Sequence, residues 1–550
     1  MMREKKDAVW WLLATGLVLG TVFIVIAVFR GTLYTLHSDD AAAVLLAREQ
    51  LVSGQLLPKD WSYAYEYWIL TLNLLILPFL KMTGQMLLSR ELAVVLQFLL
   101  FETAGYFLLK KLVSAKGALF GCILLIAPLS FLQMEHFYFQ ATYATFILWG
   151  FVILLLAFSF FQEIFAQKEK QDTDRKRSLQ KEIFLGVVLC ALIIVLGCGG
   201  TRILGTVLLP VAGSMAYIVW EDEEYSLVGI LKKRRLLVKA GFVCAAMLLG
   251  ILAGNWLIAT VGRLNGGQEM LIGKAEDFTD HLSDFVNAFF ETYGCFEAEE
   301  LMSASGILGV FKLVLALFEG IFVPVSLLVH LKELKKEQRF FVIYAALSFV
   351  VIFYMMVVCG LKNSYYFLPV YVNGVLQTCI FLEHFWRGFQ KQLQLLAAGF
   401  LLPIALFSCI IYAKYNYASV DYWAGFNTVD LGLLEFLQKE GLEYGYADFF
   451  NAGCYTVASN GAVEIVSVNE EYRFSDVEEK YVAIVRNPGS VRHWLNSDRW
   501  YRESYYAGES FVLTKAEFLD ELDASYLENA DRILTYNEYS IIVFPNILIR

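Results

Sequence analysis

The sequence predicts an α-helical polytopic membrane protein of about 11 transmembrane helices with a C-terminal mixed α/β domain. The composition is the first reason. Of the 550 residues, 58% are hydrophobic and only 18% are charged, whereas soluble globular proteins carry about a quarter charged residues. The second reason is a series of apolar runs of about 20 residues, the length that crosses the core of a bilayer. The net charge of −10 sums over both sides of a membrane, so it gives no information about nucleic acid. The partners we expect are membrane lipids and no nucleic acid.

The first apolar segment, residues 9–29, follows a basic start with Arg3, Lys5 and Lys6. It is longer than the apolar core of a signal peptide, and no small-residue cleavage site follows it. We therefore expect a retained signal anchor at this position.

Charged loops predict the orientation, because cytoplasmic loops of membrane proteins carry an excess of Lys and Arg. The segment 262–305 is instead rich in Asp and Glu, so we place the loop 261–305 outside. The N-terminus is then inside and the C-terminus outside. The basic loops lie at residues 168–181, 232–235, 332–339 and 387–391.

Four apolar segments lie between the first carboxylates, which are predicted to be outside, and the basic loop at 168–181, which is predicted to be inside. An odd number of segments must therefore cross the membrane, so one of the four does not. The segment 67–80 is the shortest, is interrupted by Asn73 and contains Pro78. Its roughly 14 residues are typical of interfacial or re-entrant segments, so we assign it to an external loop, 31–80. The predicted spans are residues 9–29, 88–109, 117–134, 137–161, 183–197, 201–220, 237–260, 306–330, 340–360, 365–383 and 393–413.

Two adjacent carboxylates, Asp39 and Asp40, follow the first span. At the outer end of a transmembrane helix, one of them can act as a general base at the water interface. The alternative is that both only begin a helix, because acidic residues in a first turn stabilise the helix dipole. We expect that helix over residues 41–52, on the membrane surface, with an apolar and a polar face.

Three more residues lie on the same predicted side. Glu66 precedes a Tyr-Trp pair, and Glu135 and His136 occupy a short external turn. Carboxylates that converge on one external cavity suit acid–base chemistry. The alternative for Glu66 is a carboxylate that reaches the membrane surface.

External cations suggest an anionic partner such as a phosphate. Arg202 follows a Gly-Gly pair and opposes the positive-inside bias. Arg263 and Lys362 lie on the same side, with the hydroxyl of Tyr365 nearby in sequence. The alternative for each cation is contact with lipid headgroups.

Charge rises and apolar runs shorten from about residue 415, which predicts an external α/β domain over 415–550 behind a transmembrane domain over 1–414. We expect a helix at 431–438 and strands at 463–468, 481–485, 506–513 and 539–544. Five aromatic side chains of this domain can either stack on a sugar or fill a core or interface: Trp494, Trp500, Tyr501, Tyr505 and Tyr506.

Nine cysteines are present, and seven fall in apolar spans, where they are expected to pack as small core residues. No spacing typical of a zinc site occurs. Cys295 and Cys454 lie in polar stretches, where they either form a disulfide or remain thiols.

These motifs, in this order, resemble the GT-C superfamily of membrane glycosyltransferases, which includes protein O-mannosyltransferases and lipid A aminoarabinose transferases. Such enzymes have an acidic pair, often Asp-Glu, just after the first span; here residues 38–41 read Ser-Asp-Asp-Ala. Glu66 before the Tyr-Trp pair and Glu135 in the second external loop are also similar. The resemblance covers residues 8–415, and by position Asp39 matches the catalytic aspartate.

The resemblance implies an inverting glycosyltransferase of the cell membrane that uses a polyprenyl-phosphate sugar at the outer face. The acceptor would be a glycan, a lipid or a protein. Asp39, alone or with Asp40, would be the catalytic base. Glu66, Glu135 and His136 would position the acceptor or, with Asp40, a divalent metal ion. The donor phosphate would bind Arg202, Arg263, Lys362 and Tyr365.

Two other classes of protein fit the span count. A transporter or flippase of lipid-linked glycans shares the cations, but such proteins show internal repeats and ionisable residues near the bilayer midplane. The sequence shows no repeat. A non-catalytic scaffold with an external binding domain would not need Asp39.

Overall fold

The computed structural model describes residues 8–165, 175–200, 202–222, 226, 233–262, 264, 273–295, 302–385, 429–475 and 480–546. The chain divides into two compact units. Unit 1 comprises Met1–Ile26, Gln97–Trp256 and Gln268–Lys414, and unit 2 comprises Ala27–Leu96, Leu257–Gly267 and Tyr415–Arg550. The division of the chain into domains at 1–414 and 415–550 stays a prediction.

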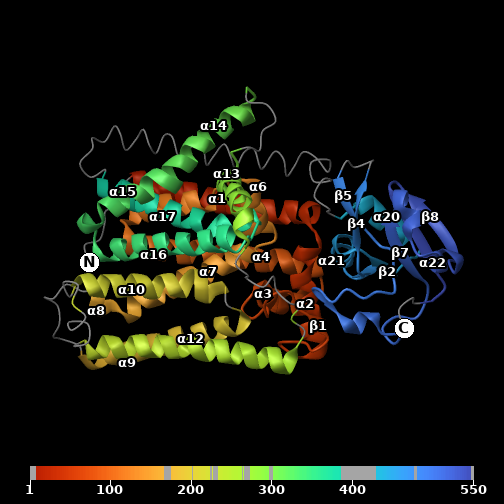
Figure 1. Cartoon of the computed structure of the whole chain (residues 1–550), viewed down its shortest axis with the longest axis horizontal. Helices are drawn as coiled ribbons and strands as arrows, with labels where there is room; N and C mark the ends of the chain where they lie inside the picture. Colours follow the sequence, from red (N-terminus) through yellow and green to blue (C-terminus); the bar gives the residue numbers. More distant parts are fainter. Residues whose placement is uncertain are drawn as a thin grey trace. The chain divides into compact units, whose positions relative to one another are not determined.

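Long apolar helices make up most of the described chain (Figure 1). Among the described residues, nine helical segments are long and apolar enough to cross a membrane, or ten if a bent pair counts as one span. These match ten of the predicted spans; the eleventh, 393–413, lies outside the described residues. The α-helices of this part of the chain, including those too short to cross a membrane, are α1 (Ala8–Thr35), α4 (Met86–Leu112), α5 (Ala115–Ile126), α6 (Phe131–Met134), α7 (Thr142–Phe160), α8 (Gln162–Phe165), α9 (Arg175–Gly199), α10 (Leu209–Asp222), α12 (Arg234–Val261), α13 (Phe278–Thr292), α14 (Ala304–Leu317), α15 (Val323–Val329), α16 (Lys336–Phe353) and α17 (Leu368–Phe385).

Several of these helices continue as wider π-helical turns, which often lie at functional sites. The π-helical turns are η1 (Glu135–Phe139), η2 (Leu204–Leu208), η4 (Phe318–Phe322) and η6 (Tyr354–Val358), and short 3-10 helices are η3 (Ala275–Asp277), η5 (Leu331–Glu333) and η7 (Ser364–Phe367).

The segment 67–80, which we predicted not to span, contains only the short helix α3 (Leu72–Thr83). The helix has 12 residues and ends at Gly84, whose left-handed backbone (φ 67°) caps it. About 20 residues are needed to cross a bilayer, so α3 is too short to do so as a single helix.

The predicted straight span 117–134 is wrong in detail. Helix α5 ends at Ile126, and α6 with η1 continues at an angle of 101°. Pro128 explains the break, because proline lacks the amide hydrogen that a helix interior needs and disfavours helical backbone in the preceding residue. Ser130 then starts the second arm by accepting a hydrogen bond from the Gln133 amide (3.1 Å).

The C-terminal segment forms a five-stranded sheet in the order β3-β2-β7-β9-β8. Strand β2 is parallel to β3 and β7, whereas β9 is antiparallel to β7 and β8. The strands are β2 (Tyr444–Ala447), β3 (Glu464–Ser467), β7 (Ser510–Lys515), β8 (Arg532–Tyr536) and β9 (Tyr539–Phe544), with a hairpin of β4 (Glu471–Ser475) and β5 (Lys480–Ile484), and a short pair of β1 (Trp61–Ser62) and β6 (Asn496–Ser497).

The expected helix at 431–438 is α20, and the four expected strands correspond to β3, β5, β7 and β9. Four strands of this segment were missed, namely β2, β4, β6 and β8. Strand β2 was missed because all four of its residues are buried, so it lacks the alternation of a half-exposed strand. The remaining short helices are α20 (Leu431–Lys439), η10 (Phe449–Asn451), α21 (Gly453–Ala458), η11 (Asp498–Tyr501), η12 (Ala516–Glu521) and α22 (Ala524–Glu528).

The helix after the first span, α2 (Ser38–Ser53), begins three residues earlier than expected, and the prediction of a half-exposed surface helix is wrong. Most of its residues are buried, on the polar as well as the apolar face. It packs against α3 and α21 within unit 2. Gly453 in α21 allows this close packing, because a side chain there would overlap Leu45.

Candidate functional site

Asp39 and Asp40 occupy the first turn of α2. His37 precedes the helix in an extended conformation, and its carbonyl accepts a hydrogen bond from the Ala41 amide (3.0 Å). The two neighbouring carboxylates differ in exposure: Asp39 is half-buried, whereas Asp40 is only 2% exposed. The same turn therefore holds an accessible and an inaccessible carboxylate.

The Asp40 carboxylate forms an ion pair with Arg90 of α4, which is itself fully buried. The Arg90 Nη2 to Asp40 Oδ1 distance is 3.5 Å, and Arg90 Nε donates to the Asp40 carbonyl at 3.2 Å. His37 Nε2 lies 3.5 Å from the same carboxylate oxygen. A buried pair of this kind is costly to break from one side, so the contact between Asp40 and Arg90 helps to hold α2 against α4.

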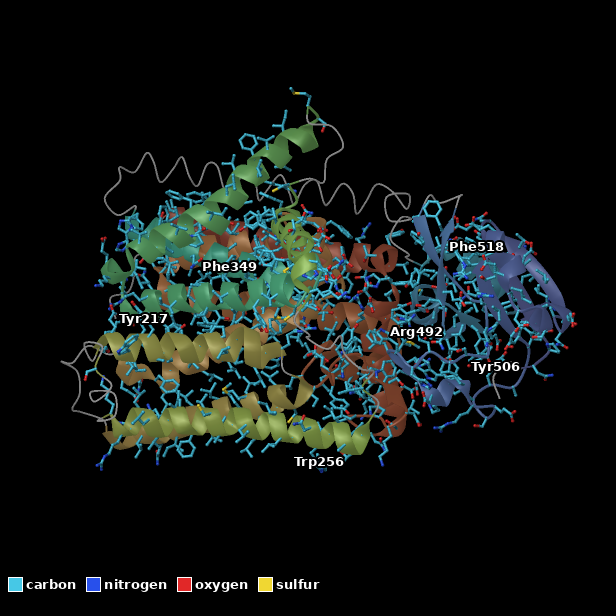
Figure 2. All side chains as sticks on the ribbon, viewed as in Figure 1. Tyr217, Trp256, Phe349, Arg492, Tyr506 and Phe518 are labelled. Atoms are coloured by element: carbon cyan, nitrogen blue, oxygen red, sulfur yellow. The ribbon has the colours of Figure 1, made fainter. Side chains whose placement is uncertain are left out.

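Asp39 lies within electrostatic range of Arg492 from the C-terminal segment (labelled in Figure 2). Burial lowers the pKa of Arg492, and the carboxylates of Asp448 and Asp39 oppose that effect. Arg492 is held by an ion pair with Glu470, and its guanidinium lies 4.7 Å from the centre of the Phe449 ring. The site thus pairs a half-buried carboxylate with a nearby anchored cation.

A hydrogen bond fixes the loop beneath Arg492 to the start of α2. Ser38 Oγ donates to the Phe450 carbonyl at 3.2 Å. Phe450 adjoins Phe449, and the Phe449 amide donates to Glu470, the partner of Arg492, at 3.4 Å. The residue before Asp39 and the residues that hold Arg492 therefore belong to one connected network.

The parallel strands explain why these acidic residues gather. Asp448 follows β2 and Glu470 lies three residues after β3, so both sit at the carboxyl ends of adjacent parallel strands, where ligands bind in open α/β sheets. Asp448 is buried and accepts hydrogen bonds from the Phe450 and Asn451 amides (3.0 and 3.3 Å). Burial raises the pKa of Asp448, although these hydrogen bonds favour its ionised form.

A second carboxylate of α2, Glu49, anchors the helix to the segment around β6. The side chain is almost fully buried and accepts hydrogen bonds from four groups, including both Arg499 Nη2 (2.6 Å) and Trp500 Nε1 (2.9 Å). Ser497 Oγ completes the set at 3.2 Å. Arg48 of α2 also anchors the helix, through an ion pair of its Nη1 atom with Glu464 Oε1 of β3 at 2.5 Å.

Two of the candidate sugar-stacking aromatics are buried. Trp500 is 4% exposed and donates to Glu49, and Tyr501 is 6% exposed and donates to the Ser467 carbonyl. Both therefore fill the core of unit 2, the alternative that the sequence left open. Trp494 is half-buried and lies against Tyr65, with ring centres 4.9 Å apart.

Glu66 is half-buried in the irregular stretch that follows β1, also within unit 2. Its neighbour Tyr67 is 2% exposed and donates from its hydroxyl to the Gly262 carbonyl at 2.8 Å. That bond ties the Glu66 stretch to the end of α12. Arg263, the next residue, lies outside the described residues.

In unit 1, three predicted site residues gather around Tyr143, which the sequence did not single out. The rings of His136 and Tyr365 lie 4.8 Å apart, and each lies near Tyr143, at 5.7 and 5.1 Å. The Arg202 guanidinium lies 5.8 Å from the centre of the Tyr143 ring. His136 Nδ1 is 2.6 Å from Gln140 Oε1. We call His136, Tyr143, Arg202 and Tyr365 the aromatic–arginine cluster.

The remaining candidates are less enclosed. Lys362 is exposed and Glu135 is half-buried. Glu135 belongs to unit 1, whereas Asp39, Asp40 and Glu66 belong to unit 2. The expected convergence of these carboxylates on one cavity stays a prediction.

No group of three or more His, Cys, Asp or Glu side chains among the described residues is arranged to hold a metal ion. Cys295 and Cys454 are not joined by a disulfide bond.

Solved structures give the chain a known fold. It is similar to ArnT from Cupriavidus metallidurans bound to undecaprenyl phosphate, at 10% identity and a TM-score of 0.57, over 98% of both chains. The apo state of the same enzyme matches with a TM-score of 0.58 over 96% of this chain and 98% of the other, again at 10% identity.

The chain has the fold of ArnT, which is a GT-C-type fold. At 10% identity the likeness establishes the fold alone. No family model matches the sequence, and no curated protein matches it either. With its many apolar helices, the GT-C fold identifies a multi-pass membrane protein.

Proposed function

We propose that the protein is an inverting glycosyltransferase that transfers a sugar from a polyprenyl-phosphate donor to a glycan, lipid or protein of the cell envelope. One observation carries the proposal. In a fold shared with an ArnT structure that holds undecaprenyl phosphate, the first turn of α2 presents one half-buried carboxylate, Asp39, while its neighbour Asp40 is held by Arg90.

Asp39 is the proposed general base. Its carboxylate accepts the proton of the acceptor hydroxyl as the hydroxyl oxygen forms a bond to the anomeric carbon of the donor. The bond between that carbon and the phosphate oxygen breaks, and polyprenyl phosphate leaves. General-base catalysis of this kind contributes about 10²- to 10⁴-fold to a rate.

Arg492 is the proposed positioning residue for Asp39. A cation anchored by Glu470 and Phe449 favours the ionised form of a nearby carboxylate, which is the form that can accept a proton. In this account the C-terminal segment completes the active site, and Asp40 has a structural role in place of the catalytic role first expected.

The aromatic–arginine cluster is proposed to bind the donor phosphate. Arg202 supplies the charge that the leaving phosphate needs, and the hydroxyl groups of Tyr143 and Tyr365 can donate to its oxygens. Lys362 and Arg263 are proposed as additional phosphate contacts, and Glu66, Glu135 and His136 as acceptor-positioning residues.

The proposed active site faces the outside of the cell membrane, with the N-terminus inside. The binding of a divalent metal ion stays a prediction. No step of the proposed reaction requires one.

The test is transfer by the purified protein in lipid nanodiscs, supplied with polyprenyl-phosphate sugars and assayed for release of polyprenyl phosphate. The wild type should release it in the presence of acceptor, and Asp39→Asn should not. A transporter or flippase would move the donor between leaflets without releasing polyprenyl phosphate, and a scaffold would do neither. Either result with the folded wild type, across a panel of donors, would exclude the proposed function.

A further inference from the structure

Helices α9 and α12 of unit 1 lie side by side (Figure 1), and the C-terminal end of α9 packs against the backbone of α12. A side chain at Gly197 would lie only 3.1 Å from the Gly250 backbone, and one at Gly254 would lie 3.3 Å from the Cys198 carbonyl. Small residues allow such backbone contact between membrane helices. Towards the N-terminal ends of both helices, a cavity of about 650 Å³ lies between them.

Apolar side chains of both helices line the cavity, together with one aromatic ring from outside the two helices. Ile183 and Val187 of α9 face Val238 and Phe242 of α12, and Phe160 lies beneath them. Gly186 makes room for the Phe160 ring, because a side chain there would lie 2.6 Å from it. The volume falls within the range of about 300 to 1,000 Å³ that is typical of small-molecule sites.

Charges line one end of this cavity. Lys239 is buried and pairs with Glu182 (2.6 Å) and Glu163 (2.5 Å), and Arg235 also pairs with Glu182. Arg234 lines the cavity too and forms no ion pair with any residue that the structure describes. The two carboxylates are therefore outnumbered by three cations, which leaves one positive charge at the charged end.

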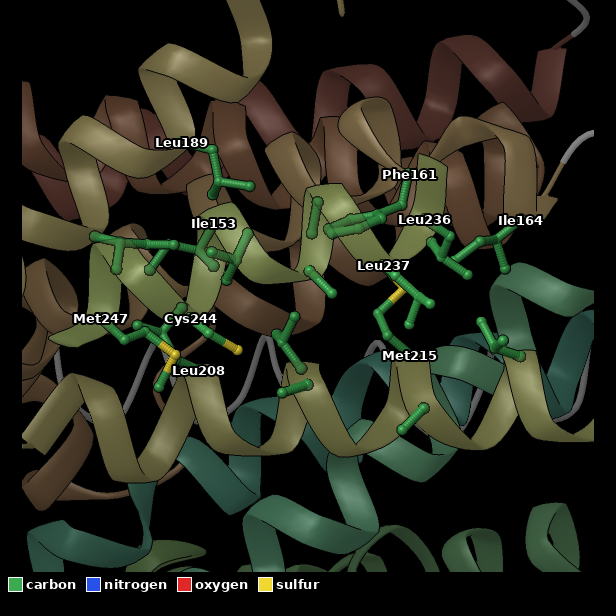
Figure 3. Close-up of a pocket in the computed structure, with 18 residues that line it drawn as sticks. Ile153, Phe161, Ile164, Leu189, Leu208, Met215, Leu236, Leu237, Cys244 and Met247 are labelled. Atoms are coloured by element: carbon green, nitrogen blue, oxygen red, sulfur yellow. The ribbon is translucent and has the colours of Figure 1, made fainter. Parts of the chain in front are cut away.

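A second cavity, of about 240 Å³, lies between α7, α9, α10 and α12 and differs in chemistry (Figure 3). Met215 of α10 and Leu237 and Cys244 of α12 are among its 18 lining residues, all of them apolar. It offers nothing to an anionic group. Of these two cavities beside α12, only the one between α9 and α12 combines apolar walls with excess positive charge.

We propose that the cavity between α9 and α12 binds an anionic phospholipid, with its phosphate at Arg234 and Arg235 and one acyl chain between Ile183 and Phe242. A phosphodiester carries one negative charge, which matches the excess of one cation. Basic pockets between transmembrane helices bind anionic headgroups in this way. The site is independent of the proposed glycosyltransfer.

The test is native mass spectrometry of the full chain released from nanodiscs that contain equal amounts of phosphatidylglycerol and phosphatidylcholine. The wild type should retain phosphatidylglycerol preferentially. Arg234→Gln should weaken that retention about fivefold, the effect of roughly one interfacial charge. Val238→Trp should abolish it without changing any charge, because the indole fills the cavity at a side chain that is 57% exposed.

Lys181→Gln is the matched control, because Lys181 is an exposed cation near the same end of α9 and does not line the cavity. It should leave retention unchanged. Equal losses in the Lys181 and Arg234 variants, full retention in a folded Val238→Trp, or equal retention of the two lipids by the wild type would each overturn the proposal. Melting temperatures of all variants verify that they are folded.

Discussion

Asp40 of α2 and Arg90 of α4 form a buried ion pair, with 3.5 Å between Oδ1 and Nη2 and almost no exposure of either side chain. The pair assigns different roles to the two adjacent aspartates. Asp40 is enclosed with its cation, whereas Asp39 remains half-buried and near Arg492. The predictions that follow separate stability from catalysis at these two positions.

Asp40→Asn should destabilise the protein strongly. Removing one partner of a buried ion pair leaves the other charge uncompensated, at a cost of about 3 to 5 kcal/mol. Asp39→Asn should cost far less, because its side chain is half-buried. Thermal melting in detergent compares the two isosteric variants, and equal losses of melting temperature would contradict the assignment.

The double variant Asp40→Leu with Arg90→Met should be more stable than either single variant. Replacing both members of a buried pair by apolar groups removes the uncompensated charge, so the effects should be strongly non-additive. The measurement is a double-mutant cycle on melting temperature. Additive losses would mean that the two side chains do not interact.

Glu49→Gln should loosen the contact between α2 and the segment around β6. Its carboxylate accepts from Arg499, Trp500 and Ser497, and hydrogen bonds to a charged group contribute about 1.5 to 3 kcal/mol each. A clear fall in melting temperature is expected. Glu528→Gln, an exposed change of the same chemistry in α22, is the control and should have no effect.

Arg492→Gln should lower the transfer rate and move the acid limb of the pH–rate profile to higher pH. The ionised Asp39 loses a stabilising cation, so it takes up a proton at a higher pH than in the wild type. Other charged groups near Asp39 and Arg492 are His37, Asp40, Asp448 and Glu470, and none of them changes. Arg492→Lys should restore part of the rate, and a rate loss with no movement of the limb would indicate a purely structural role.

Cys454 should resist maleimide at pH 8 in the folded protein. Burial raises the pKa of its thiol to about 12, so only roughly one molecule in ten thousand carries the reactive thiolate at that pH. The measurement is mass spectrometry of the labelled Cys454 peptide. Ser525→Cys, at an exposed position of α22, is the reactive control, and equal labelling of both sites would contradict the burial.

Hydropathy and alternation predicted most elements correctly because both are local properties of a sequence. They gave the spans from α1 to α17, the short α3 and four strands of the C-terminal segment. The buried state of α2 could not be predicted, because its covering elements, α3 and α21, come from different parts of the chain. The difference between Asp39 and Asp40 depends on Arg90, which lies 50 positions further along the chain, and no sequence spacing pairs it with Asp40.

The aromatic–arginine cluster could likewise be predicted only in part from the sequence. His136, Arg202 and Tyr365 were selected because each carries a polar group at a predicted external turn, and the structure brings them together. Tyr143, which contacts all three, lies in the first turn of an apolar helix, where an aromatic side chain is common at a membrane interface whatever its function. Arg492 was missed because its link to Asp39 runs through the loops after β2 and β3, which no sequence spacing shows.

The central claim is that Asp39 is the base of a lipid-linked sugar transfer. The most direct measurement is release of polyprenyl phosphate by the wild type, Asp39→Asn and the control Asp39→Glu, in nanodiscs with donor and acceptor and with melting temperatures matched. The account predicts that Asp39→Asn loses at least about 100-fold in rate while Asp39→Glu retains part of it. Wild-type rates in folded Asp39→Asn would contradict the account.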